Sequence, residues 1–268
     1  MSTMLSHAEQ APGGGVLRTS VGIAGRSVRT IVRLPSAFFP SVLMPIFQAI
    51  AFSGTYFAIT LIPGFPTDRS MNWFLPLACL MGSGFAGVGL GLTTIRDLES
   101  GFFDRLRMAP TPRLSLLLGP LLSCWFRVII LVTVVLGVGL AFGGRLTDGV
   151  LGLFTVYVAA LGIATMGAGW ALGLAYRFGD MRAAALMQLT LFNALFLTNA
   201  QTPLNVMTGW LHSIARVNPI TNVLRLARQG FLGEVTWHDS WGGLVAILVL
   251  GGLTLIFAQT GLRRLNQR

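Results

Sequence analysis

The chain has 268 residues, of which 53% are hydrophobic and only 10% are charged. A soluble domain carries roughly 25% charged residues, so this composition excludes an ordinary water-soluble fold. The net charge of +10 would suit a nucleic-acid binder, but in so apolar a chain a basic excess marks loops that face the cytoplasm and its anionic lipids. The composition predicts an all-α membrane protein of several spans, with membrane lipid and no nucleic acid as its surroundings.

All 19 basic residues are arginine. The phosphate-binding loop of an ATPase needs a lysine to reach the terminal phosphates, and a Schiff-base enzyme needs one as its nucleophile. We therefore expect no ATPase site and no bound cofactor in this chain. His7, His212 and His238 lack the spacing of metal ligands or of a catalytic triad, so neither a metal site nor an enzyme active site is predicted.

Residues 1–36 are predicted to form a cytoplasmic N-terminus. Between positions 16 and 33, apolar residues such as Val21 and Val28 recur on one side of a helix, and four arginines gather on another side. This pattern is typical of an amphipathic helix that lies in the membrane surface with its arginines toward lipid phosphates. The alternative is an ordinary solvated helix.

Six apolar stretches follow, each long enough to cross about 30 Å of hydrocarbon. They cover residues 37–62, 73–95, 114–142, 150–176, 183–200 and 241–262. We therefore predict a six-helix transmembrane domain over residues 37–262 and a cytoplasmic tail over residues 263–268.

The arginines orient these spans. Those predicted to be cytoplasmic are four in the N-terminal segment, Arg96, Arg105, Arg107 and Arg113 after span two, Arg177 and Arg182 after span four, and Arg263, Arg264 and Arg268 in the tail. The short loops on the other side carry only Arg69 and Arg145. Both termini are therefore predicted to be cytoplasmic. The segment between spans five and six breaks the rule, because it places Arg216, Arg225 and Arg228 outside.

The loop after span two, at about residues 96–110, has a distinctive pattern. Leu98, Phe102 and Leu106 are spaced four residues apart, charges of both signs surround them, and Pro110 ends the run. A short helix with an apolar stripe outside the bilayer is suited to docking into a groove on a partner protein. The alternative is a connector that lies on lipid.

The segment at about residues 201–228 is too broken by proline and glycine for a seventh span, yet too apolar for a free loop. Irregular backbone at membrane depth is tolerated only where protein or a water-filled cavity surrounds it. We therefore predict a re-entrant outer hairpin of short helices, with Trp210 at the membrane interface and the arginines at a polar mouth or near outer phosphates.

Two motifs resemble those of type-2 ABC exporter permeases, closest to the daunorubicin-resistance-like drug and lipid exporters. The pattern Pro-x(5)-Gly-Trp-Leu-x(6)-Asn-Pro-x-Thr runs from Pro203 to Thr221 and is followed by Arg228. The pattern Glu-x-Gly-x(4)-Leu-x(3)-Pro runs from Glu99 to Pro110 and resembles the coupling helix of that family. The resemblance covers nearly the whole chain.

The resemblance implies a function and two groups of residues. Contact with a separate ATPase subunit, which binds ATP and Mg, is implied for Asp97, Glu99, Gly101, Phe102 and Leu106. An outer gate is implied for Pro203, Trp210, Asn218, Pro219, Arg225 and Arg228. Arg225 stands where the family often has an acidic residue, and a second subunit could supply the missing carboxylate. The implied assembly is a permease dimer, identical or paralogous, in a bacterial inner membrane, which exports drug-like or lipid-like substrates.

Three polar residues within the spans are further candidates for the transport pathway. Arg127 is the one charge well inside a span, and an intramembrane charge is a functional candidate by default, although it could also reach the cytosolic end of its helix. Gln188 and Asn193 in span five could face a cavity or bond a neighbouring helix. Glycines four residues apart, at positions 87 and 91 and again at 169 and 173, suit close helix packing.

The alternative function is an ion-coupled secondary transporter. Such proteins place ionisable residues at mid-membrane for protons or break helices there for sodium. All nine acidic residues of this chain lie in predicted loops or at span edges, which argues against that class.

Overall fold

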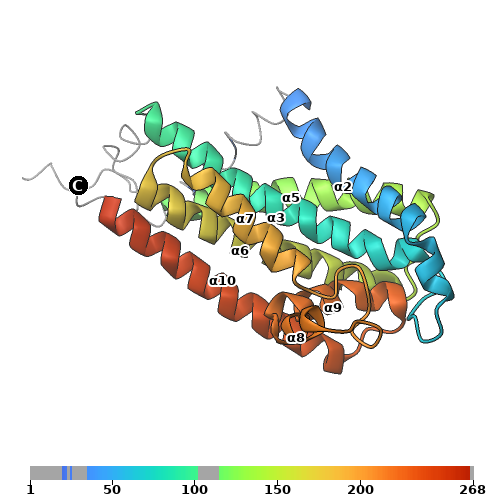
Figure 1. The fold of residues 1–268 in the computed structure, drawn as a ribbon. Coiled ribbons are helices and arrows are strands. Elements are labelled where there is room, and N and C mark those ends of the chain that lie inside the picture. The colour runs from blue at the N-terminus through green and yellow to red at the C-terminus, as the bar shows by residue number, and fades with distance from the viewer. Residues whose placement is uncertain (1–19, 23–24, 26–34, 102–114, 266–268) are drawn as a thin grey trace, which may run out of the picture.

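The computed structural model in Figure 1 describes residues 20–22, 25, 35–101 and 115–265. All regular structure in these ranges is helical, which confirms the predicted all-α class. In chain order the elements are α2 (Pro35–Thr55), the 3₁₀ helix η1 (Phe57–Leu61), α3 (Ser70–Glu99), α5 (Ser115–Ala141), α6 (Gly149–Phe178), α7 (Ala183–Phe196), α8 (Trp210–Val217), α9 (Pro219–Leu232) and α10 (Trp237–Leu265).

Four helices are long and apolar enough to cross a membrane: α3, α5, α6 and α10. Their apolar segments have 26 to 30 residues, or about 39–45 Å at about 1.5 Å per residue, against about 30 Å of hydrocarbon. They correspond to predicted spans two, three, four and six. The helices α2 and α7 are apolar but shorter, so the count of six spans stays a prediction.

Two predicted spans differ from the helices that form. The first was expected to run to residue 62, but α2 ends at Thr55 and the chain continues as η1. The fifth was expected to run to residue 200, but α7 ends at Phe196 after 14 residues. In both places the apolar run outlasts the helix, because apolar composition alone does not fix where the backbone turns.

The centre of the bundle is formed by α3 and α6, with α10 along one side and α2 on the opposite side (Figure 1). Small residues allow this close approach. Gly87 and Gly91 lie directly against α6, so that a Cβ added to Gly91 would be 2.5 Å from that of Ala171. Gly169 and Gly173 lie directly against α10. The predicted role of these glycines in close helix packing is confirmed.

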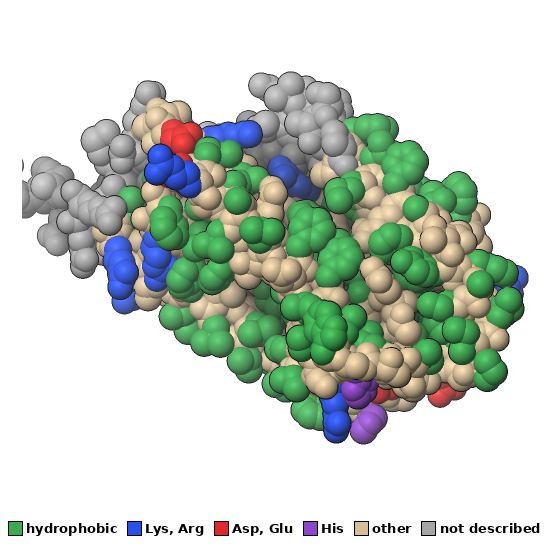
Figure 2. Space-filling view, viewed as in Figure 1, with side chains coloured by type: hydrophobic (Ala, Val, Ile, Leu, Met, Phe, Trp, Pro, Cys, Tyr) green, Lys and Arg blue, Asp and Glu red, His purple; other side chains and the backbone are tan. Residues whose placement is uncertain are grey.

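Charged side chains gather toward the two ends of the face that Figure 2 shows, with hydrophobic side chains between them. The C-terminal ends of α3, α6 and α10 lie at one end of the bundle, and α8 and α9 lie at the other (Figure 1). Large apolar side chains are exposed along α10, among them Leu248 at 74% and Leu253 at 57%. A helix that exposes leucines to this extent is suited to contact with lipid. The surface helix predicted for residues 16–33 falls outside the described residues, except for positions 20–22 and 25.

Candidate functional site

The predicted hairpin (residues 201–228) meets the bundle at the C-terminal end of α7. The last four carbonyl groups of any helix lack partners within that helix, and in an apolar setting they must be satisfied by other groups. Here the partners come from α9, whose side chains reach the end of α7 and the turn after it.

Asn218 satisfies two helix ends at once. Its Nδ2 donates to the carbonyls of Ala194 and Leu197, at 2.9 Å each, and so covers the end of α7. Its Oδ1 accepts the backbone N–H of Ile220 at 3.0 Å, which caps the start of α9. Pro219 follows as the first residue of α9, where its missing N–H costs nothing. These contacts explain why asparagine and proline stand together here.

Arg228 is a fully buried arginine, with 2% of its surface exposed. Its guanidinium donates from Nε to the carbonyl of Trp73 at 3.1 Å, from Nη1 to that of Asn199 at 2.8 Å, and from Nη2 to that of Ala200 at 2.6 Å. It also lies 3.7 Å above the ring of Trp73. Arg228 therefore joins three parts of the chain: α9, the turn after α7, and the first turn of α3.

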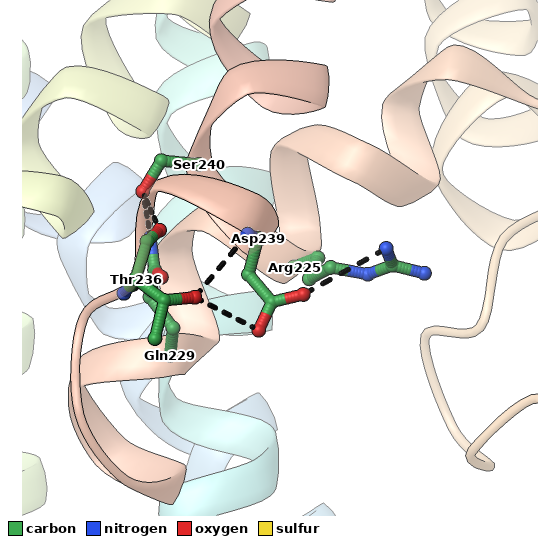
Figure 3. Close-up of polar contacts among 5 residues, drawn as sticks. All are labelled: Arg225, Gln229, Thr236, Asp239 and Ser240. Atoms are coloured by element: carbon green, nitrogen blue, oxygen red, sulfur yellow. Dashed lines mark hydrogen bonds and ion pairs between the residues drawn. The ribbon is translucent and has the colours of Figure 1, made fainter.

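Arg225 lies one turn before Arg228 and faces outward. Figure 3 shows it reaching toward Asp239 in the first turn of α10, with 3.9 Å between Nη1 and Oδ1. Thr236 Oγ1 accepts the N–H of Asp239, and Gln229 Nε2 donates to Ser240 Oγ at 2.8 Å. The carboxylate beside Arg225 thus comes from the same chain, so a second subunit is not needed to supply it, contrary to the hypothesis drawn from the sequence.

The other predicted gate residues lie in the same hairpin. Pro203 is buried, and its carbonyl accepts the N–H groups of Val206 and Met207 at 3.1 Å each. Trp210 begins α8 and is 70% exposed, and Val217 at the end of that helix is 81% exposed. The structure therefore brings Asn218 and Arg228 together at the end of α7, whereas Trp210 lies apart from them on the surface.

The predicted coupling segment lies at the far end of α3. Arg96–Glu99 continue α3 without a break, with Asp97 half-buried and Glu99 exposed at its last turn. Gly101 follows with a φ of +67°, which ends the helix. Leu98, in the last turn of α3, packs against the core cluster that contains Leu116 and Leu262. Phe102 and Leu106 lie outside the described residues.

The three candidate pathway residues do not converge on one site. Arg127 is half-buried on α5, and it forms no ion pair within the described ranges. Gln188 and Asn193 are both exposed on α7. Asn193 lines a groove between α7 and α8, together with Ile214 and Val217. The structure thus leaves the two amides facing outward from this chain.

Several residues of this region were not predicted. Trp73 carries the ring beneath Arg228, and Asn72 donates to the carbonyl of Phe231 and accepts the N–H of Arg145. Asp148 accepts the N–H of Val235 at 2.6 Å. The neighbouring Asn72 and Trp73 at the start of a span could have been noticed in the sequence. Their positions alone, however, do not show which backbone groups lie nearby.

The chain matches the family model of the ABC-2 type transporter over residues 22–232, which include α2 through α9 and so the hairpin and the far end of α3. The chain belongs to the ABC-2 type transporter family. As an ABC-2 type chain it is a membrane subunit of an ABC transporter, and the predicted resemblance is confirmed.

Individual relatives have low sequence identity to this chain but match most of its length. The chain is 24% identical, over 98% of its length and 91% of the relative's, to the daunorubicin resistance ABC transporter permease protein DrrB1 of Streptomyces coeruleorubidus. It is 26% identical to the putative transport permease ycf38 of Pyropia yezoensis, over 84% of this chain and 81% of that one. It is 23% identical to the probable multidrug ABC transporter permease YbhR of Escherichia coli (strain K12), over 65% of this chain and 47% of that one.

Proposed function

We propose that this ABC-2 type chain is the permease subunit of an exporter for amphipathic drug-like or lipid-like substrates, driven by ATP that a separate ATPase subunit hydrolyses. The observation that carries the proposal is the position of α3. This helix runs unbroken from Trp73, which accepts from Arg228, to Glu99 at the start of the coupling segment. It spans about 39 Å at about 1.5 Å per residue.

A rigid, buried helix can pass a displacement from one end to the other. Most residues of α3 are buried, and it contacts α2, α5, α6, α7 and α9. Closure of an ATPase dimer against the segment after Glu99 would move α3 along or about its axis. Because Arg228 ties the other end of α3 to the turn after α7, that motion would reach the hairpin. Catalysis is thus assigned to the partner and movement to this chain.

The proposed topology places both termini and the 96–114 segment in the cytoplasm and the hairpin outside. It counts α2 and α7 as spans together with the four long helices, and it assigns residues 16–33 to the membrane surface. The arginine distribution supports this orientation. A second permease subunit, identical or paralogous, would complete the pathway, and the exposed amides of Gln188 and Asn193 on α7 suit such a contact better than lipid.

The proposed substrate class and location follow the printed descriptions of relatives. DrrB1 is a daunorubicin resistance permease and YbhR is a probable multidrug permease. Both names support drug transport, and the proposed location is a bacterial inner membrane. The alternative is an ion-coupled transporter, which would need acidic residues near the middle of its spans. The acidic residues of α3 and α10 are Asp97, Glu99 and Asp239, and all three lie in terminal turns, so these helices do not support that alternative.

The proposal is tested by co-purification with an ABC ATPase expressed together with this chain. Phe102→Asp and Leu106→Asp place a charge on the apolar stripe expected to dock into the ATPase, and each should abolish co-purification while the permease still folds. Met181→Asp is the matched control, because Met181 is an exposed apolar residue in the turn between α6 and α7, another loop that is predicted to be cytoplasmic. Retention of the ATPase by both stripe variants would overturn the proposal, as would its loss in the control.

A further inference from the structure

A cavity of about 370 Å³ with several charged and polar side chains in its walls lies beside Arg228 at the hairpin end of the bundle. We call it the Arg228 cavity. Its walls include Trp73, Asn199, Arg225, Arg228, Glu234 and Asp239. They come from the start of α3, the turn after α7, α9, and the region where α9 joins α10.

The cavity has unused hydrogen-bonding capacity. Trp73 is 2% exposed, yet its Nε1 is buried and has no hydrogen-bond partner in the part of the chain that the structure describes. The Oδ1 of Asn199 is also buried without a partner. Buried polar atoms are nearly always satisfied, and two exceptions in the walls of one cavity indicate that a ligand or ordered water completes the site. An indole N–H can only donate, so its missing partner is an acceptor.

The charges around the cavity indicate what kind of acceptor the ligand carries. A guanidinium has five N–H donors, and three of those on Arg228 go to neutral carbonyls, which leaves two. No ion pair to Arg228 forms among the residues that the structure describes. Arg225 lies one turn away and pairs with Asp239 at 3.9 Å, where both side chains remain partly exposed. Glu234 also lines the cavity but is exposed, so water screens its charge.

A second groove, of about 310 Å³, adjoins the same ion pair. Arg225 and Asp239 line both spaces, so the two spaces are neighbours. Its other wall follows α10 past Val245 and Val249, which are 49% and 54% exposed. Arginines beside a groove with apolar walls along a membrane helix suit a ligand with an anionic head group and an apolar chain.

We propose that the Arg228 cavity binds a phosphate group, either as the head group of a phospholipid in the leaflet at the hairpin end of the bundle or as free phosphate. Trp73 Nε1 and the unused N–H groups of Arg228 would donate to its oxygens, and Arg225 would contribute charge from the cavity edge. The adjoining groove would hold the acyl chain of a lipid. This site is defined by binding alone and does not depend on the direction or energy source of transport.

The test is a binding titration on the purified full chain in a neutral detergent. Three probes are compared: phosphatidylglycerol, diacylglycerol with the same acyl chains, and inorganic phosphate. Tight binding of phosphatidylglycerol with at least tenfold weaker binding of the other two identifies a lipid head group. Equal binding of inorganic phosphate identifies free phosphate as the ligand. Equal binding of diacylglycerol would overturn the proposal, because no phosphate would then be recognised.

Paired variants tie the binding to this cavity. Trp73→Phe removes one N–H that has no partner among the described residues, and it should weaken phosphate binding about tenfold. Trp170→Phe is the control, because the Nε1 of Trp170 is equally buried and unpartnered but lies on α6 outside this cavity. Unchanged affinity in Trp73→Phe, or equal loss in Trp170→Phe, would overturn the assignment.

A second pair covers the case in which Trp73→Phe fails to fold. Arg225→Gln replaces an exposed arginine of the cavity wall and should weaken binding about threefold. Arg216→Gln changes an exposed arginine on α8 that does not line the cavity, and it should leave affinity unchanged. If the two variants bind alike, the Arg228 cavity is not the phosphate site.

Discussion

Arg228 is held by neutral carbonyl groups and an aromatic ring. Removing a charge from water costs several kcal/mol, and hydrogen bonds from a charged donor return about 1.5–3 kcal/mol each. Three such bonds and the ring of Trp73 can therefore offset the burial. Arg177 repeats the arrangement near the other end of the bundle, where it donates to the carbonyl of Phe257 and lies 3.7 Å above its ring.

We predict that Arg228→Lys destabilises the protein, although the positive charge is kept. An ammonium group cannot reach three separate carbonyls in the planar geometry of a guanidinium, nor stack on Trp73 in the same way. We expect a loss of about 2–4 kcal/mol in unfolding free energy, measured by denaturant titration in detergent. Arg216→Lys, at an exposed position on α8, should change it by less than about 0.5 kcal/mol. Equal stability of the two variants would contradict the role given to Arg228.

The sequence identified the side chains of the hairpin better than their partners. Asn218 and Arg228 were predicted from a motif, and the structure gives both a clear position. Their partners are backbone carbonyls at the end of α7, and any residue type can supply a carbonyl, so no sequence pattern marks them. The acidic partner of Arg225 was missed for a different reason. Asp239 lies 14 positions further along and approaches only because α10 folds back beside α9.

The apolar runs of the sequence predicted the long helices correctly, but they did not predict where the helices end. The apolar stretch of α7 continues to position 200, but the helix stops at Phe196, where Asn218 and Arg228 satisfy the carbonyls that the stop exposes. At the far end of α3, the four-residue spacing of Leu98 and Phe102 favoured one helix, but Gly101 adopts a left-handed conformation between them. Contacts made elsewhere in the chain therefore decide where helices end.

For the packing between helices, we predict that Gly152→Ala weakens the attachment of α9 to α6. A Cβ on Gly152 would lie 2.7 Å from the Cα of Gly230, and neither backbone can yield without moving a helix. We expect a loss of about 1–3 kcal/mol in unfolding free energy. Gly137→Ala on α5, where no atom lies within 4 Å of the added methyl group, should be neutral or slightly stabilising. A neutral Gly152→Ala would mean that α6 and α9 are less closely packed.

A second prediction concerns the turn after α3. Gly101→Ala forces a residue with a Cβ into the left-handed region, at a cost of roughly 1–2 kcal/mol confined to this turn. If the turn sets the direction of the coupling segment, ATPase activity of the purified complex should fall several-fold while the permease stays folded. Gly89→Ala in the middle of α3, which has open space around it, is the control and should leave ATPase activity unchanged.

In the whole molecule, the two ends of the bundle have different proposed functions. The end that carries Glu99, Arg177 and the C-terminal part of α10 is proposed to meet the ATPase, and the end that carries α8 and α9 is proposed to face outward (Figure 1). The buried helix α3 connects them.

This polarity predicts a labelling pattern for single-cysteine variants. Asn205→Cys and Ser100→Cys place a thiol at exposed positions on opposite ends, and the native Cys79 and Cys124 are 0% and 4% exposed, so their background labelling should be low. A membrane-impermeant maleimide should label Asn205→Cys in intact cells and label Ser100→Cys only after lysis. The reverse pattern would invert the proposed topology.

The most direct measurement is transport in liposomes that contain the purified chain with or without its ATPase subunit. We expect a fluorescent amphipathic substrate to move only when the ATPase subunit and ATP with Mg are both present. Concentrative transport by the chain alone, driven by a proton or sodium gradient, would contradict the central claim that this bundle moves its substrate with energy released on another subunit.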